Sequence, residues 1–99
     1  MTRATFHPEA GAEIAEAARY YETRSPGLGF SFLMELDDAI EQVVANPKAF
    51  QLVSREIRRK PLRRFPYSLL YVIEADRIRV VAAAHHRRRP DYWRSRLLG

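Results

Sequence analysis

Cations, histidines and tyrosines gather in the second half of the chain, and these are the side chains whose types could perform chemistry. They are Arg58, Lys60, Arg63, Arg64, Tyr67, His85, His86, Arg87, Arg88, Arg89 and Tyr92. Arginine forks bind phosphate or carboxylate bidentately while aromatic faces stack, which suits a nucleic acid or an acidic peptide strand. Metal-free cleavage of RNA by 2′-hydroxyl attack needs a proton acceptor, a proton donor and cations against the charged phosphorane, roles open to His, Tyr and Arg. The set therefore predicts a surface that either binds or cleaves an anionic chain.

Metal and cofactor chemistry find little support in the sequence. His85 and His86 are adjacent on a predicted strand, so their side chains point to opposite faces and cannot easily ligate one ion. The chain has no cysteine, which excludes disulfides and thiolate metal sites. It also lacks a glycine-rich phosphate loop, a nucleophile elbow and a carboxylate pair in an acid–base arrangement. We therefore expect neither a metal nor a cofactor.

Charge is distributed unevenly along the sequence. Residues 1–50 hold 4 Lys or Arg against 8 Asp or Glu, whereas residues 51–99 hold 13 against 4, so the two halves carry formal charges of −4 and +9. This asymmetry favours an acidic partner for the second half, either nucleic acid or an acidic protein segment. Ordinary surface solubility is the alternative explanation.

The length of the chain, 99 residues, predicts a single domain over 1–99 that can bury a two-layer core. The first residues contain no apolar signal-peptide core, and no stretch approaches the roughly 18 apolar residues of a membrane span. We expect a cytoplasmic protein with no membrane partner.

Two helices are predicted in the first half of the chain. Pro8 suits the first turn of a helix over residues 8–23, and its alanine-rich contact face comprises Ala10, Ile14, Ala17, Ala18 and Tyr21. After the breaker segment 25–29, a second helix runs to Asn46-Pro47. Its predicted buried stripe is Phe30, Leu33, Leu36, Ile40, Val43 and Val44, and its predicted wet face is Glu35, Asp38 and Glu41. Because the connection is short, the helices should form an antiparallel hairpin.

Strands are predicted for the remainder. An edge strand is expected at residues 3–7, and further strands at 50–53, 57–65, 68–75 and 78–85. From Ser68 onward both alternating faces are apolar, so this strand should be central and covered on both sides. The last two strands should pair as a hairpin, with Ile78, Val80, Ala82 and Ala84 on one face and Val81 and Ala83 on the other. The tail after Pro90 should form a short helical turn or lie across the sheet.

Together these elements predict an α+β fold, in which an N-terminal strand and an antiparallel two-helix hairpin pack on a mainly antiparallel sheet of four strands or slightly more. Cations on the strand before the central one cannot all be buried, because an unpaired buried cation is very costly. These cations are Arg58, Lys60, Arg63 and Arg64. The sheet must therefore present them to water or to an anionic partner.

Several motifs, in order, give the sequence a family resemblance that covers nearly the whole chain. They are Phe-His-Pro-Glu-Ala at 6–10, Tyr-Tyr-Glu at 20–22, Gly-Leu-Gly at 27–29, Asn-Pro at 46–47, Arg-Arg-Phe-Pro-Tyr-Ser-Leu-Leu-Tyr at 63–71 and His-Arg-Arg-Arg-Pro-Asp-Tyr-Trp at 86–93. The sequence resembles the RelE/ParE superfamily of toxins from type II toxin–antitoxin (plasmid stabilisation) modules. The resemblance implies a helix hairpin on an antiparallel sheet. It also implies an acidic, partly disordered antitoxin that folds on binding, with operator DNA bound only through the antitoxin.

The resemblance leaves two targets open. RelE-like members cut mRNA in the ribosome, whereas ParE-like members poison DNA gyrase and lack the nuclease residues. Nucleases of the family usually carry an arginine where this chain has Ser68, while Arg87 or Arg88 matches their second arginine and Tyr92 their C-terminal tyrosine. Because the nuclease set is incomplete, gyrase inhibition is the favoured hypothesis and ribosome-dependent cleavage the alternative. A third hypothesis is a degenerate member that binds only its antitoxin.

Each hypothesis assigns its own residues. For target or antitoxin binding they are Arg58, Lys60, Arg63, Arg64, Tyr67, Arg87, Arg88, Arg89, Tyr92 and Trp93. If the chain is a nuclease, Arg63 or Arg64 and Arg87 or Arg88 would stabilise the phosphorane, and His86 or Tyr92 would transfer protons.

Overall fold

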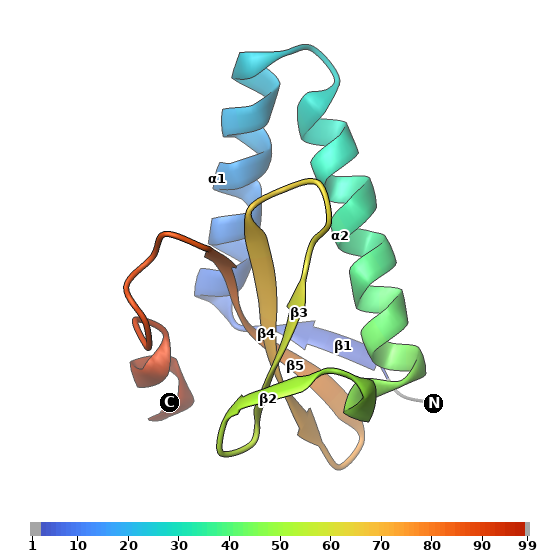
Figure 1. Ribbon diagram of the computed structural model, residues 1–99, viewed down its shortest axis with the longest axis vertical. Helices are drawn as coiled ribbons and strands as arrows, with labels where there is room; N and C mark the ends of the chain where they lie inside the picture. The colour runs from blue at the N-terminus through green and yellow to red at the C-terminus, as the bar shows by residue number, and fades with distance from the viewer. Residues whose placement is uncertain (1–2, 99) are drawn as a thin grey trace.

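The computed structural model describes residues 3–98 as two helices packed against a five-stranded sheet (Figure 1). The elements in chain order are β1 (Arg3–Phe6), α1 (Pro8–Arg24), α2 (Leu28–Ala45), the 3₁₀ turn η1 (Pro47–Ala49), β2 (Gln51–Ser54), β3 (Ile57–Pro61), β4 (Tyr67–Glu74), β5 (Arg77–His85) and the 3₁₀ turn η2 (Arg94–Leu98). The predicted α+β fold is confirmed, with five strands in one mixed sheet. None of the described helices is long and apolar enough to cross a membrane.

The sheet has the strand order β1-β5-β4-β3-β2. Strand β4 is the middle strand, as its apolar faces predicted, and Ser68 to Val72 are all buried. Strand β1 is an edge strand, as expected, and it pairs in parallel with β5, whereas the other neighbours are antiparallel. The helices cover one face of the sheet, which we call the helix face. The C-terminal tail, residues 86–98, lies on the other, which we call the tail face.

Helix α1 presents the predicted contact face to the core. His7 is the N-cap, and its Nδ1 accepts a hydrogen bond of 3.1 Å from the Glu9 amide. Ala10 and Ala17 are buried, and the other three residues of the face pack against the same cluster. These small side chains suit a closely approaching second helix.

Helix α2 is rotated relative to the sequence prediction. Phe30 is 67% exposed and Leu33 is 39% exposed, so their assignment to the buried stripe is wrong. The buried residues are Gly29, Phe32, Leu36, Ala39 and Val43. Gly29 explains the rotation, because a Cβ there would lie 2.5 Å from the Ala18 carbonyl oxygen of α1. Only glycine permits this contact, and the residues three or four positions apart from it then face inward.

Strand β5 departs from the predicted alternation because of a β-bulge. Leu70 pairs with Ala82, but its neighbour Tyr71 pairs with Val80, so Val81 has no partner on β4. A bulge adds one residue and reverses the facing of those that follow. Val81 and Ala82 therefore both pack on the tail face, and Ala84 packs there too, whereas Ala83 packs with Val80 on the helix face. The predicted faces of β5 are thus wrong from Ala82 onward.

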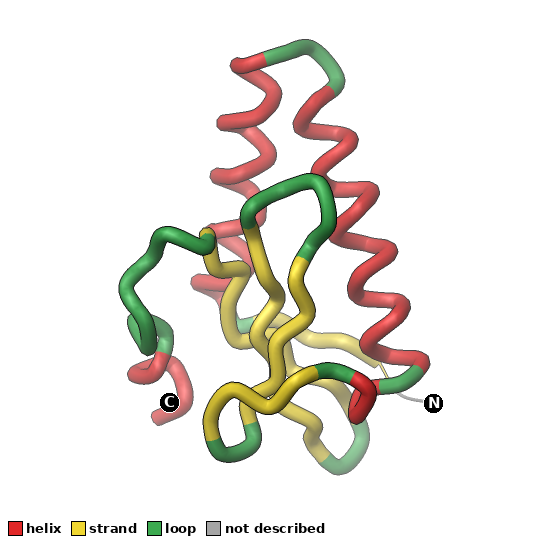
Figure 2. Tube along the Cα trace, viewed as in Figure 1, coloured by secondary structure: helices red, strands yellow, loops and turns green. Residues whose placement is uncertain are grey.

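Strand β3 ends at Pro61, four residues earlier than predicted, so Arg63 and Arg64 lie in the loop to β4 rather than on a strand. Glu35 on α2 accepts hydrogen bonds from the amides of both arginines. The loop is thereby held beside α2 (Figure 2). The prediction that Glu35 lies on the wet face of α2 is also wrong, because its side chain is only 14% exposed.

The tail crosses the sheet and ends in a helical turn, so both predicted outcomes occur together. Trp93, which is 5% exposed, packs into the cluster of the tail face. That cluster also contains Ile57, Leu70, Val72, Val81 and Ala82. The tail is thus part of the hydrophobic core and covers the sheet where no helix does.

Candidate functional site

A hydrogen-bonded group of three side chains lies on the tail face, one each from β3, the central strand β4 and the tail. Arg59 pairs with Leu70 across β3 and β4, so its side chain shares a face with Leu70 and Ser68. Arg59 Nε donates to Ser68 Oγ at 3.1 Å. Ser68 Oγ and His86 Nε2 are 3.0 Å apart and share a further hydrogen bond. A backbone hydrogen bond of 2.8 Å from the His86 amide to the Pro66 carbonyl holds the imidazole at this place.

These three residues form one wall of a cavity of about 350 Å³, which we call the tail-face cavity. Its other lining residues are Val53, Leu70, Ala84, His85, Arg88, Arg89, Pro90, Asp91, Tyr92 and Trp93. Three arginines and two imidazoles therefore share one cavity with a single carboxylate. Sequence reasoning missed Arg59, although strand alternation placed it on the opposite face from Arg58 and Lys60.

Arg58 and Lys60 lie on the helix face of β3. Arg58 Nη1 donates to the carbonyl oxygen of Phe50 at 2.7 Å, and Lys60 Nζ lies 4.9 Å from the centroid of the Phe50 ring. Both contacts fix the segment that joins η1 to β2. Arg58 and Lys60, which were predicted as interaction residues, therefore stabilise the fold of the isolated chain.

Arg63 and Arg64 belong to a different part of the surface, beside α2. Arg64 Nε donates to Glu35 Oε1 at 3.1 Å. Burial alone would raise the pKa of Glu35, but hydrogen bonds from the Arg63 and Arg64 amides and from the Arg64 guanidinium outweigh it and lower the pKa. Neither arginine lines the cavity that holds His86. The structure does not bring together this part of the predicted nuclease set.

The tail is fastened to α1 through a partly buried carboxylate, Glu13. The Tyr92 hydroxyl donates to Glu13 Oε2 at 2.6 Å, and the guanidinium of Arg96 donates to both carboxylate oxygens at 2.9 Å each. The Ala83 amide of β5 adds a fourth hydrogen bond of 3.0 Å. Burial and the hydrogen bond to Glu13 raise the pKa of Tyr92. The Tyr92 hydroxyl is therefore a protonated donor at neutral pH and is poorly suited to accept a proton.

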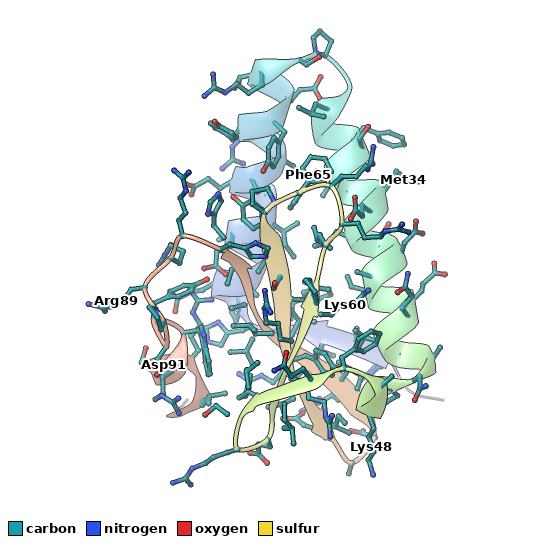
Figure 3. The ribbon with its side chains drawn as sticks, viewed as in Figure 1. Met34, Lys48, Lys60, Phe65, Arg89 and Asp91 are labelled. Atoms are coloured by element: carbon teal, nitrogen blue, oxygen red, sulfur yellow. The ribbon has the colours of Figure 1, made fainter. Side chains whose placement is uncertain are left out.

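Arg87, Arg88 and Arg89 are exposed and form no ion pair with a described residue. The Arg88 guanidinium lies 3.8 Å from the centroid of the Tyr92 ring, a cation–π contact. Arg89 extends away from the ribbon (Figure 3). These arginines are the predicted interaction residues that remain most available to a partner.

Tyr67 and His85 contact each other on the helix side of the same region, with ring centroids 5.0 Å apart. They line a second cavity with Tyr20, Tyr21, Glu16 and Arg88, among others.

Within residues 3–98 there is no group of three His, Asp or Glu side chains that could hold a metal ion.

Comparison with known proteins identifies the family. The family model described as the ParE toxin of the type II toxin–antitoxin system parDE matches residues 4–90. A solved chain from a structure titled "Chromosomal ParDE TA system from P. aeruginosa" superposes with a TM-score of 0.63 at 21% identity, covering 86% of this chain and 95% of that one. No curated protein matches the sequence significantly. The solved chain shows the fold, and the family match over most of the sequence shows that this chain belongs to the ParE toxin family of type II toxin–antitoxin systems.

Proposed function

We propose that the chain inhibits DNA gyrase and is neutralised by a cognate antitoxin. The observation that carries this proposal is the match of residues 4–90 to the ParE toxin model. The geometry supports a binding role, because the Tyr92 hydroxyl is held by Glu13 at 2.6 Å and its pKa is raised. A group committed in this way is a poor proton acceptor. The exposed arginines at 87–89 are the proposed contacts to the target.

The experiment is a comparison of two purified systems. Increasing amounts of the chain should progressively block supercoiling of relaxed plasmid by gyrase, while a reconstituted translation system keeps its rate. Chain premixed with its antitoxin is the control and should leave gyrase active. In cells induced without antitoxin, pulse labelling should show DNA synthesis stopping before protein synthesis. Translation failing first, with gyrase unaffected, would contradict the proposal.

Ribosome-dependent mRNA cleavage is a second candidate, and one contact favours it. Arg59 places a guanidinium 3.1 Å from the hydroxyl of Ser68, the position at which nucleases of the superfamily carry an arginine. His86 is bonded to the same hydroxyl and could transfer a proton. The translation arm of the same experiment tests this candidate. Activity in neither arm would favour a degenerate member that binds only its antitoxin.

The antitoxin is proposed to be an acidic segment that folds on this surface and carries the contact to operator DNA. Its acidic residues would meet the basic residues of the sheet and its apolar residues would meet α2. On α2, Phe30, Leu33 and Met34 are 67%, 39% and 48% exposed. Figure 3 labels Met34 on this helix. The three residues lie at helical spacings of three and four residues, so they form one apolar stripe.

Replacing Phe30 with serine should weaken antitoxin binding by about tenfold or more, the loss that corresponds to about 1.4 kcal/mol. The melting temperature should hardly change, because the side chain is 67% exposed. Calorimetric titration of antitoxin into each variant provides the measurement. The control is Leu52→Ser, which removes an apolar side chain from β2 that is 49% exposed. Equal binding by both variants and the parent chain would show that the antitoxin does not cover α2.

A further inference from the structure

We propose that the tail-face cavity is a phosphodiester site, through which the toxin binds the backbone of a nucleic acid while it acts on its target. This inference deepens the proposed function and rests on it, because gyrase works on DNA and a poison at that complex can touch both components. The site consists of Arg59, Ser68 and His86, with Arg88 and Arg89 at its margin.

The hydrogen bonds prepare Arg59 to bind an anion. Its Nε is engaged by Ser68 Oγ at 3.1 Å, which fixes the plane of the guanidinium. Neither of its Nη nitrogens has a hydrogen-bond acceptor among the described residues. Ser68, on the central strand, is 3% exposed and is hydrogen-bonded in turn to His86. The central strand therefore fixes the positions of Arg59 and His86. A fixed fork with free donors is the geometry that binds a phosphate through two oxygens.

The charges around the cavity lack a counterpart within the described chain. Arg59, Arg88 and Arg89 make no ion pair, and the one carboxylate in the lining, Asp91, is already 3.1 Å from Arg94. Like charges that face one cavity repel each other, and an anion in the cavity removes this cost. An apolar wall that includes Leu70 and Trp93 reduces screening by water and strengthens the attraction.

The spread of the cations favours a chain of phosphates over a single carboxylate. Arg59 comes from β3, whereas His86, Arg88 and Arg89 come from the tail, so the donors face the cavity from two sides. The volume of about 350 Å³ is at the lower end of the range for small-ligand pockets and can admit one phosphate with parts of its sugars. Exposed Arg89 would then reach a neighbouring phosphate. Backbone contacts of this kind do not depend on base sequence.

The test compares two variants that lose the same charge. Arg59→Gln alters the site, whereas Arg77→Gln removes an arginine that pairs with Glu74 at the β4–β5 turn. Anisotropy of a labelled 20-base-pair DNA duplex, a design length of about two helical turns, is measured with the isolated chain at several salt concentrations. Arg59→Gln should weaken binding about tenfold and reduce the slope of log K against log salt by about one, while Arg77→Gln stays within about twofold of the parent. Equal losses in the two variants would overturn the proposal, because net charge alone would then explain binding.

A second measurement locates the anion without relying on affinity. Titration with inorganic phosphate should shift the imidazole NMR signals of His86 and leave those of His7, the N-cap of α1, unchanged. The shift should be absent in Arg59→Gln, whose unchanged backbone spectrum would show that the variant is folded. Identical shifts in the variant and the parent would overturn the site.

Two further arms identify the ligand and separate this inference from the proposed function. Single-stranded RNA of the same length is compared with the duplex, and tighter binding of either one supports a phosphodiester site and names its source. A polyglutamate peptide that displaces both nucleic acids at equal charge would overturn the proposal in favour of a carboxylate site. If Arg59→Gln inhibits gyrase as well as the parent does, the phosphodiester site is wrong and the proposed function stands. If duplex binding depends on Arg59 but the parent never inhibits gyrase, the phosphodiester site stands and the proposed function is wrong.

Discussion

Replacing Trp93 with alanine should lower the free energy of unfolding by about 3–5 kcal/mol, the range for deletion of a buried large aromatic side chain. Trp93 is 5% exposed and is the aromatic centre of the tail-face cluster. Its loss would leave Leu70 and Val81 under an empty space and release the tail from the sheet. Domains of this size have total stabilities of about 5–15 kcal/mol, so the variant should melt at least 10 °C lower, at about 4–8 °C per kcal/mol.

The matched control is Phe30→Ala, which removes an aromatic side chain that is 67% exposed. It should change stability by less than about 0.5 kcal/mol, as expected for a surface substitution. Urea denaturation followed by far-UV circular dichroism suits both variants, because Trp93 is the single tryptophan of the chain and its fluorescence is lost with it. Similar small effects in the two variants would mean that the tail is not part of the core.

The sequence predicted the main elements of this fold because their signals are local. The apolar run from Ser68 to Ile73 indicated a strand covered on both faces, and β4 is the middle strand. Alanine at helical spacing indicated the contact face of α1, and Ala10 and Ala17 are buried there. In each case the pattern of side chains within one element was sufficient.

Predictions failed where facing depended on a second element. The stripe of α2 was misplaced because Phe30 and Leu33 are as apolar as the residues that are buried, and only the contact of Gly29 with α1 sets the rotation. The bulge at Val81 cannot be read from β5 alone, because it is defined by the pairing of β4. Both errors arise from tertiary contacts that override local periodicity.

The candidate site shows the same division. The arginines, His86 and Tyr92 were identified by type, but Arg59 was overlooked within a run of cations, since its importance depends on the register that places it beside Ser68. Glu13 carried no sequence signal, because its partner Tyr92 is 79 positions away. The residue types predicted which chemistry is available, whereas the fold determines which of these side chains lie together in one site.

Replacing Glu13 with glutamine should destabilise the protein by about 3 kcal/mol at pH 7, because it leaves Arg96 buried without its counter-charge. Arg96 is 8% exposed, and its other carboxylate neighbour, Glu9, is 3.8 Å away and mostly in water. Glutamine has nearly the same shape and can still accept from Tyr92, so the variant tests charge rather than packing. Glu16→Gln, which removes an exposed carboxylate from the same helix, is the matched control and should cost less than about 0.5 kcal/mol.

The pH dependence of this loss gives the sharper result. Burial alone would raise the pKa of Glu13, but hydrogen bonds from Arg96, Tyr92 and the Ala83 amide outweigh it, so the folded-state pKa lies below the usual value of 4.5. A carboxylate with a lowered pKa stabilises the fold fully above its unfolded pKa and loses this effect as the pH falls through the folded pKa. The difference in unfolding free energy between the parent and Glu13→Gln should therefore be constant from about pH 6 to 8 and shrink below about pH 4, since the parent itself becomes protonated there. A difference that stays constant into acid would show that the carboxylate's charge does not hold the tail, and the arrangement of Tyr92 and Arg96 would then have to rest on packing alone.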